Sequence, residues 1–225
     1  LIGVLTLYRI EKDSFNSDHL RILQATSNKI ALSIENALRF RQVSTTAVTD
    51  ALTSLPNARS LFLQLESELT HARSNAHSLA VIVSDLDGFK GVNDRFGHLE
   101  GNRVLREVAD ALKHQCRGSD YVARMGGDEF VVLLPNCPQA TLELRIQKMR
   151  DACIEVGVKL FGERTIDASF GVAQYPTDAD DAESLLAVAD RRMYQVKDQH
   201  HNKPDDPPPA VEPADSLDAM RRALL

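Results

Sequence analysis

Residues 121–134 read YVARMGGDEFVVLL, and this stretch decides the fold that we expect for the chain. Two apolar segments, Tyr121–Ala123 and Phe130–Leu134, lie on either side of a glycine pair, which is the pattern of two short strands joined by a tight turn. The hairpin makes the expected sheet at least partly antiparallel. The carboxylates of Asp128 and Glu129 follow glycines that allow a positive φ and let a phosphate approach the backbone. Such a turn is commonly structural, and here it is also a candidate ligand site.

Strand and helix patterns alternate around this hairpin. Further strands are predicted at Leu79–Leu86 and Thr165–Tyr175, and helices at residues 57–74, 101–115, 138–156 and 181–198. Pro56 is expected at the start of the first of these helices. Alternating strands and helices predict an α/β sandwich. The expected fold class is therefore α/β (an α+β sandwich), with a mixed, partly antiparallel sheet flanked by helices.

The composition is that of an ordinary globular chain. It has 225 residues, 43% of them hydrophobic, and a net charge of −6, which argues against a general surface for nucleic acid. A site for an anionic triphosphate would therefore need local cations and a metal. Three cysteines without metal-ligand spacing indicate reduced thiols and a cytoplasmic protein. No apolar run reaches the roughly 20 residues of a membrane helix, so we expect no membrane segment in this chain.

The two ends differ from the central part. LIGVLTLYRI at Leu1–Ile10 alternates like a strand, and Ser17 or Asp18 is a plausible cap for a helix of about 25–30 residues. The apolar positions of that helix follow a heptad and are Leu20, Leu23, Ile30, Ile34, Ala37 and Val48. The heptad favours a connector helix in a dimeric coiled coil over a helix packed on its own domain. Residues 203–214, KPDDPPPAVEPA, are expected to be flexible. The predicted domains are 1–46, 47–202 and a tail at 203–225.

An apolar strand that ends in carboxylates is the second feature of interest. Asp85 and Asp87 close the strand that begins at Leu79, and residues two apart share one face of a strand. Carboxylates at a strand end are most often solvated and structural. If this strand lies beside the one that follows Asp128 and Glu129, the carboxylates form a plausible magnesium cage, because magnesium takes a few protein oxygens and completes its shell with phosphates and water.

The segment between the two carboxylate pairs, FKGVNDRFGHLEGN at residues 89–102, favours a nucleotide. It contains a lysine near the carboxylates, Lys90, and amide side chains suited to the edge of a base. Lys197, on the last predicted helix, is a second candidate cation for phosphate. Each of these residues alone is typical of an ordinary surface. Their order within one segment favours a site for a magnesium-bound nucleoside triphosphate.

These motifs resemble the GGDEF family, the diguanylate cyclases, over about residues 47–202. The matching motifs are D-x-L-T-x-L-P-N at Asp50–Asn57, D-x-D-x-F-K-x-x-N-D at Asp85–Asp94, G-H-x-x-G at Gly97–Gly101, G-G-D-E-F at Gly126–Phe130 and A-D-x-x-M-Y-x-x-K at Ala189–Lys197. The resemblance implies a five-stranded sheet flanked by helices, similar to the palm of polymerases and class III nucleotidyl cyclases. Residues 1–46 resemble, more loosely, the C-terminal end of a GAF sensory domain.

The resemblance implies roles for individual residues. Asp85, Asp128 and the carbonyl of Leu86 would bind Mg²⁺ or Mn²⁺, and Glu129 would help to bind the metal or deprotonate the attacking hydroxyl. The implied substrate contacts are Lys90 and Lys197 at the terminal phosphates, with Lys90 also counted as catalytic, and Asn93, His98, Asn102 and Phe89 around the base and ribose.

The implied reaction joins two molecules of GTP. The 3′-hydroxyl of one attacks the α-phosphorus of the other, pyrophosphate leaves, and a second such step closes cyclic di-GMP. Because each protomer would hold one substrate, the active species is expected to be a homodimer. Arg117-Gly118-Ser119-Asp120 matches the R-x-x-D motif that the family uses to bind its cyclic dinucleotide product as an inhibitor, with Arg124 as a helper.

Two positions depart from the family pattern. Asn102 stands where the family usually has an aspartate that accepts from guanine, and His201 stands where an arginine is common. An amide presents a donor to a guanine donor, and one unpaired buried donor costs about 1–3 kcal/mol. The same amide suits adenine. The main expectation is a cyclase that uses GTP. The alternatives are a cyclase that also takes ATP and makes cyclic AMP-GMP, and a catalytically silent domain that binds nucleotide and signals by dimerisation.

Overall fold

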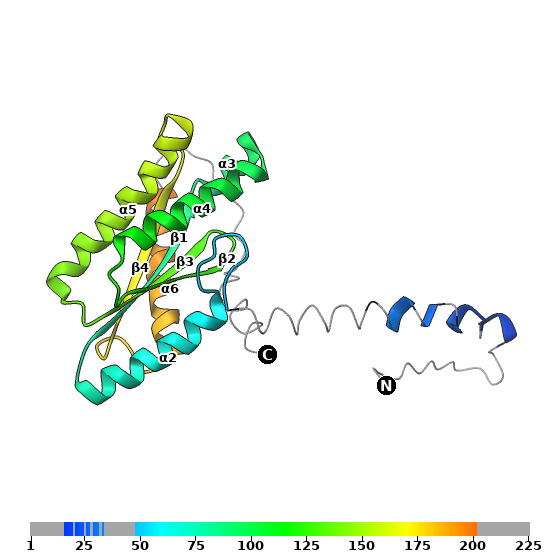
Figure 1. Ribbon diagram of the computed structural model, residues 1–225, viewed down its shortest axis with the longest axis horizontal. Helices are drawn as coiled ribbons and strands as arrows, with labels where there is room; N and C mark the ends of the chain where they lie inside the picture. Colours follow the sequence, from blue (N-terminus) through cyan, green and yellow to red (C-terminus); the bar gives the residue numbers. More distant parts are fainter. Residues whose placement is uncertain are drawn as a thin grey trace. The chain divides into compact units, whose positions relative to one another are not determined.

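The structure is a computed structural model of the chain, and it describes residues 16–19, 21–24, 26, 27, 29–31, 33 and 48–201 (Figure 1). The chain divides into two units, Leu1–Ala47 and Val48–Leu225, and each is described by itself. The strand predicted at residues 1–10, the second half of the predicted connector helix and the tail at 203–225 lie outside the described residues. No helix in the described ranges is long and apolar enough to cross a bilayer.

The first unit contains the start of the predicted connector helix. Its described residues from Ser17 to Ser33 are helical. The side-chain oxygen of Asn16 accepts a hydrogen bond from the backbone amide of His19 at 3.0 Å. This bond identifies Asn16 as the N-cap. The cap therefore lies one residue before Ser17 and two before Asp18, the predicted candidates.

Four antiparallel strands form the sheet of the second unit. They are β1 (Leu79–Asp87), β2 (Tyr121–Gly126), β3 (Glu129–Pro135) and β4 (Asp167–Tyr175), in the order β2-β3-β1-β4. Every pairing is antiparallel. The predicted class is confirmed, but the expectation of five mixed strands is corrected for the described residues. Strands β1 and β2 run parallel to each other but do not pair. Strand β3 lies between them and pairs with both.

Five helices flank this sheet. They are α2 (Ala58–Asn75), α3 (Phe89–Phe96), α4 (His98–Gln115), α5 (Gln139–Phe161) and α6 (Ala182–His201). Sequence patterns located four of them within a few residues, but they missed the short α3, and α4 starts at His98, three residues before the predicted start. Asn57 caps α2 by accepting from the amide of Ser60 at 3.0 Å, and Pro56 precedes that cap.

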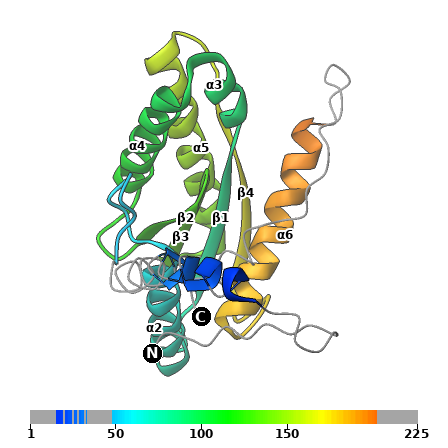
Figure 2. The same cartoon turned by 90° about the vertical axis from the view of Figure 1, so that its right-hand side faces the viewer.

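The sheet separates two apolar cores. Alternate residues of β1 point to opposite faces: Ala80, Ile82 and Leu86 belong to one core, and Leu79, Val81 and Val83 to the other. Helices α4 and α5 cover the first face, and α2 and α6 cover the second, as Figures 1 and 2 show. Asp85 and Asp87 continue the second series, so their side chains leave the strand on the α6 side. The alternation of side chains along β1 therefore places Asp85 and Asp87 on the face that α6 covers.

Helix α6 packs directly on the backbone of β4 at Gly171. A Cβ atom at that glycine would lie 2.0 Å from the carbonyl oxygen of Ala189 and 2.2 Å from the backbone nitrogen of Met193. Ala189, Met193 and Lys197 are spaced four apart and share one helix face. The close approach at Gly171 therefore brings Lys197, one turn beyond Met193, to the end of the sheet where Asp85 lies.

Candidate active site

Two neighbouring strands bring the predicted carboxylates together. Asp85 of β1 pairs in register with Glu129 of β3, so the two residues are direct cross-strand neighbours. Asp128 precedes Glu129 in the hairpin turn, where Gly127 has a φ of 51° and no Cβ to oppose it. The hypothesis that the strand of Asp85 lies beside the strand of Glu129 is confirmed.

Lys197 contacts this group of acids. Its Nζ atom lies 2.6 Å from Oδ1 of Asp85, and 112 residues separate the two in sequence. The side chains are 29% and 11% exposed, so the pair is largely removed from water. The sequence suggested Lys197 as a cation for phosphate. In the structure its ammonium group is bound to a carboxylate that the resemblance assigns to the metal.

Two acids of this group, Asp128 and Glu129, have raised pKa values. Burial is the largest cause for Asp128 and Asp85 the next, and together they raise the pKa of Asp128 to about 6. Burial, followed by the charges of Asp85, Asp190 and Asp128, raises the pKa of Glu129 to about 7. Lys197 acts in the opposite direction on both. The site therefore carries more negative charge than its own cations balance, which favours the binding of a further cation.

The residues fit a magnesium ion that arrives with a phosphate ligand. No group of three or more His, Cys, Asp or Glu side chains forms a ready metal cage in the described part of the chain. Magnesium does not need one, because it binds one or two carboxylates together with water and substrate phosphates. Asp85 and Asp128 supply such carboxylates, and their mutual repulsion is what a divalent cation would relieve. Leu86 lies in β1 next to Asp85, where its backbone is near the same strand end.

A serine that the sequence did not single out supports the end of β1. The hydroxyl of Ser169, which is fully buried, donates to Oδ2 of Asp87 at 2.6 Å. Ser169 lies in β4 directly opposite Asp85. Asp190 of α6 is a second omission, and its charge contributes to the raised pKa of Glu129. It belongs to the motif at Ala189–Lys197, so the motif was the available signal.

Arg124 connects the signature turn to a distant motif. Its guanidinium donates to the carbonyl oxygen of Gly127 from Nε at 3.1 Å and from Nη2 at 2.6 Å. Nη1 donates to Oδ1 of Asp50 at 2.8 Å, which also accepts from the amide and hydroxyl of Thr53. Burial opposes ionisation of Asp50, but the bonds from Thr53 and Arg124 outweigh it and lower its pKa. The resemblance made Arg124 a helper in the product site; the structure uses its guanidinium to hold the turn.

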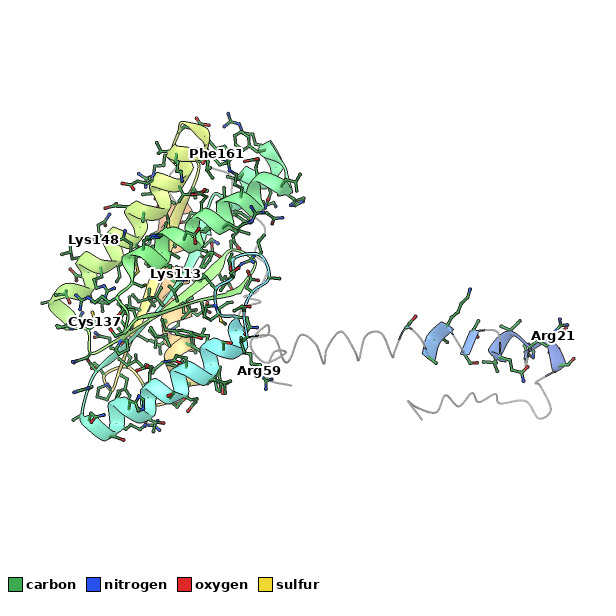
Figure 3. The ribbon with its side chains drawn as sticks, viewed as in Figure 1. Arg21, Arg59, Lys113, Cys137, Lys148 and Phe161 are labelled. Atoms are coloured by element: carbon green, nitrogen blue, oxygen red, sulfur yellow. The ribbon has the colours of Figure 1, made fainter. Side chains whose placement is uncertain are left out.

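The residues assigned to the base meet at the junction of α3 and α4. A Cβ atom at Gly101 would lie 2.0 Å from Oδ1 of Asn93 and 3.4 Å from the ring of Phe89, so Gly101 leaves room for both side chains. Asn102 follows on α4 and is half-buried. Lys90 and His98, at the starts of the two helices, are exposed. The end of α3 packs on α5, where the rings of Phe96 and Phe161 stack with their centroids 4.4 Å apart. Figure 3 labels Phe161 at the end of α5.

The R-x-x-D motif forms a separate turn before β2. Asp120 accepts at 2.7 Å from the backbone nitrogen of Arg117 and pairs at 2.6 Å with Arg145 of α5. Its side chain is only 2% exposed, whereas Arg117 is exposed. Sequence reasoning missed Arg145, because no local motif marks it. The structure thus gives Asp120 a structural partner and leaves the side chain of Arg117 at the surface.

Comparisons with known proteins match this arrangement of motifs. The family described as "Diguanylate cyclase, GGDEF domain" matches residues 47–203. The diguanylate cyclase TpbB of Pseudomonas aeruginosa is 38% identical over 201 residues, which are 88% of this chain and 44% of TpbB. Diguanylate cyclase DgcP of Escherichia coli is 32% identical over 213 residues, 90% of this chain and 62% of DgcP.

Solved structures show the same fold. The GGDEF domain of TpbB superposes with a TM-score of 0.60 at 38% identity, covering 67% of this chain and 89% of that domain. The GGDEF domain of DgcB from Caulobacter crescentus, solved in complex with c-di-GMP, gives a TM-score of 0.60 at 28% identity, covering 68% and 91%. The chain spans 26% and 44% of the length of the two curated relatives MucR and TpbB from Pseudomonas aeruginosa.

Proposed function

Because the chain belongs to the GGDEF-domain family of diguanylate cyclases, we propose that it condenses two GTP molecules to cyclic di-GMP and two pyrophosphates. The observation that carries this proposal is the pairing of Asp85 with Glu129 on adjacent strands, with Asp128 in the turn and Lys197 beside them. The relatives TpbB and DgcP are both named diguanylate cyclases, which supports the proposal. The reaction makes the enzyme a nucleotidyltransferase.

The chain's own residues account for binding and proton transfer. Asp85, Asp128 and the Leu86 carbonyl would hold Mg²⁺ or Mn²⁺, which would polarise the phosphoryl oxygens and lower the pKa of the attacking hydroxyl. Glu129 accepts the proton from the 3′-hydroxyl of the first GTP. The 3′-oxygen of that GTP forms a bond to the α-phosphorus of the second GTP. The bond from that phosphorus to the bridging oxygen breaks, and pyrophosphate leaves with its charge held by Lys90 and Lys197.

Asn102 decides which base the site accepts. Asn93, His98 and Phe89 would surround the base with it, and guanine presents two donors where Asn102 has only one acceptor. GTP is the proposed main substrate, at an affinity about ten- to a hundredfold below that of an aspartate site. The alternative in the same class is a cyclase that also uses ATP and makes cyclic AMP-GMP, which the adenine-compatible amide favours.

Several features of the whole protein belong to this proposal. The enzyme works as a homodimer, aligned by the heptad helix within residues 1–46, which also include the end of a GAF-like domain, and it resides in the cytoplasm. Its product inhibits it at Arg117 and Asp120. The exposed side chain of Arg117 supports this last point, because an arginine can both stack on guanine and fork to a phosphate. Arg117→Ala is expected to relieve inhibition by added cyclic di-GMP.

Mass spectrometry of the products tests the proposed function. The purified protein is incubated with Mg²⁺ and GTP, with ATP, and with both nucleotides. Cyclic di-GMP from GTP alone is expected, and Asp128→Ala is expected to abolish it while Asp110→Ala, an exposed acid on α4, has no effect. No cyclic dinucleotide from any mixture would leave the silent nucleotide-binding domain as the better account. A predominance of cyclic AMP-GMP would establish the relaxed cyclase instead.

A further inference from the structure

Asp85 has two possible partners, the ammonium group of Lys197 and the metal that the proposed function requires. The ammonium is 2.6 Å from Oδ1 of Asp85, and the same carboxylate is a proposed ligand of the metal. A lysine ammonium and a divalent cation at one carboxylate compete for its negative charge, because their own charges repel each other at short range. A metal bound to Asp85 therefore weakens the ion pair between Asp85 and Lys197.

We propose that Lys197 is an internal counter-ion, which occupies Asp85 in the empty site and moves to the triphosphate when the metal takes its place. This inference rests on the proposed function, since it needs a metal-bound triphosphate as the ligand. The inference adds an order of steps: the metal binds Asp85 together with the nucleotide, and Lys197 moves from Asp85 to the triphosphate. The protein disfavours the metal alone and accepts it together with the nucleotide.

The packing of α6 allows this exchange without a movement of the helix. The backbone at Ala189 and Met193 is held against Gly171, where there is no space for even one extra carbon atom. Lys197 lies one turn further on, and its four-carbon stem has rotatable bonds that move the ammonium by several ångströms. The backbone end of the side chain is held in place by this packing, while rotation about the bonds of the stem can carry the ammonium from Asp85 to a phosphate.

The charges around the pair give the exchange its direction. Asp85 lies directly across from Glu129, which follows Asp128 in the chain, and Lys197 brings a positive charge to these acids. A metal bound to Asp85 and Asp128 would neutralise these acids in place of Lys197. A triphosphate offers the lysine several anionic oxygens at the same moment. Metal and nucleotide are therefore expected to bind with positive coupling that passes through Lys197.

The first test measures Mn²⁺ binding to the full chain without nucleotide, by electron paramagnetic resonance of the free ion. Lys197→Met removes the competing ammonium and keeps the stem, and it is expected to bind Mn²⁺ about tenfold more tightly than the wild type. Lys197→Gln serves as a second variant if the first is poorly folded. Lys148→Met is the matched control, because Lys148 is exposed on α5, on the other face of the sheet (Figure 3).

The control and a double variant decide whether the effect is local. Lys148→Met is expected to leave Mn²⁺ affinity within twofold of the wild type. In an Asp85→Asn background, Lys197→Met is expected to give no gain. Unchanged or weaker Mn²⁺ binding by both Lys197 variants overturns the proposal, and so does an equal gain in the Lys148 control or in the Asp85→Asn background.

The second test measures the coupling itself with a GTP analogue that has a methylene bridge between the α- and β-phosphorus. The analogue is expected to tighten Mn²⁺ binding much more in the wild type than in Lys197→Met, and equal factors in the two proteins would contradict the exchange. Neither readout requires turnover. Loss of product formation with these results intact removes only the proposed function, whereas normal product formation with equal coupling removes only the exchange.

Discussion

At the scale of single residues, Arg124 connects the signature turn to Asp50, which lies 74 residues before Arg124 in the sequence. The D-x-L-T-x-L-P-N motif looks like a turn before a helix, and the signature turn looks like a hairpin. One guanidinium joins them, with Asp50 on one side and the Gly127 carbonyl on the other. This bridge fixes the backbone immediately before Asp128, so its main effect on the reaction is on position.

Replacing Arg124 should therefore affect both stability and turnover. Arg124→Ala leaves Asp50 and the Gly127 carbonyl without this donor, and it is expected to lower the free energy of unfolding by about 1–3 kcal/mol. Arg124→Lys keeps the charge but cannot fork to two acceptors, so it is expected to recover stability more than kcat. Urea unfolding and steady-state kinetics measure the two effects.

The control for Arg124 is an arginine in an exposed pair. Arg103→Ala removes a surface contact to Glu100 at 3.4 Å and is expected to cost less than about 0.5 kcal/mol. If Arg124→Lys restored kcat fully, the fork geometry would not matter for the turn.

Asn102 gives the second prediction at this scale. Asn102→Asp replaces a donor by an acceptor where guanine has its amino group, and it is expected to raise the kcat/KM ratio of GTP over ATP by about ten- to a hundredfold. Competition assays with both nucleotides measure the ratio. An unchanged ratio would show that water or Asn93 already satisfies guanine.

At the scale of elements, the packing of α6 on β4 positions Lys197. Gly171→Ala puts a carbon atom 2.0 Å from the Ala189 carbonyl, so the helix must shift or the strand must bend. The expected result is a loss of about 1–3 kcal/mol in the free energy of unfolding, together with a fall in kcat because Lys197 moves with the helix.

A glycine in open space is the control for this packing. Gly91→Ala meets no atom within 4 Å on helix α3 and is expected to be neutral or slightly stabilising. Thermal melts of both variants give the comparison. A Gly171→Ala protein as stable and active as the wild type would mean that the helix does not need this close approach.

The start of β4 has a pH dependence of its own. Burial disfavours the charge on Asp167, but hydrogen bonds from Arg150, the Ala168 amide and Arg164 outweigh it and lower its pKa to about 2. A lowered pKa in the folded state stabilises the protein above the unfolded value of 3.8, and this contribution is lost as the pH falls toward 2.

Asp167→Asn should show that window. It is expected to cost about 1–3 kcal/mol at pH 6, with the difference from the wild type shrinking between pH 4 and the lowest pH at which both still fold. Urea unfolding at several pH values measures it, with the exposed Asp151→Asn as control. A difference that stays constant down to pH 3 would contradict the ion pair.

The same elements show what the sequence could and could not predict. The hairpin, the strand of Asp85 and the last helix follow from local patterns, and the motifs singled out Lys197 and the acids that the fold brings together. The position of β3 between β1 and β2 does not follow, because alternation of strands and helices does not specify which strands pair. The contact of Arg145 with Asp120 and that of Arg124 with Asp50 could not be predicted either. They span 25 and 74 residues, and such contacts leave no local signal in the sequence.

At the scale of the whole molecule, one protomer presents one set of acids, while the proposed reaction joins two nucleotides. Specific activity is therefore expected to rise with protein concentration and to level off as a dimer forms. Activity at several dilutions, compared with light-scattering masses, measures this. Constant activity per protomer in a solution of monomers would contradict the two-protomer reaction.

The central claim is that the acids of β1 and the signature turn transfer a nucleotidyl group. Phosphorus NMR of a reaction with GTP and Mg²⁺ tests it most directly, because it identifies both the bond that breaks and its leaving group. We expect two pyrophosphates for each cyclic di-GMP, and neither product with Asp128→Ala. Release of inorganic phosphate without cyclic dinucleotide, or pyrophosphate formation that survives Asp128→Ala, would contradict it.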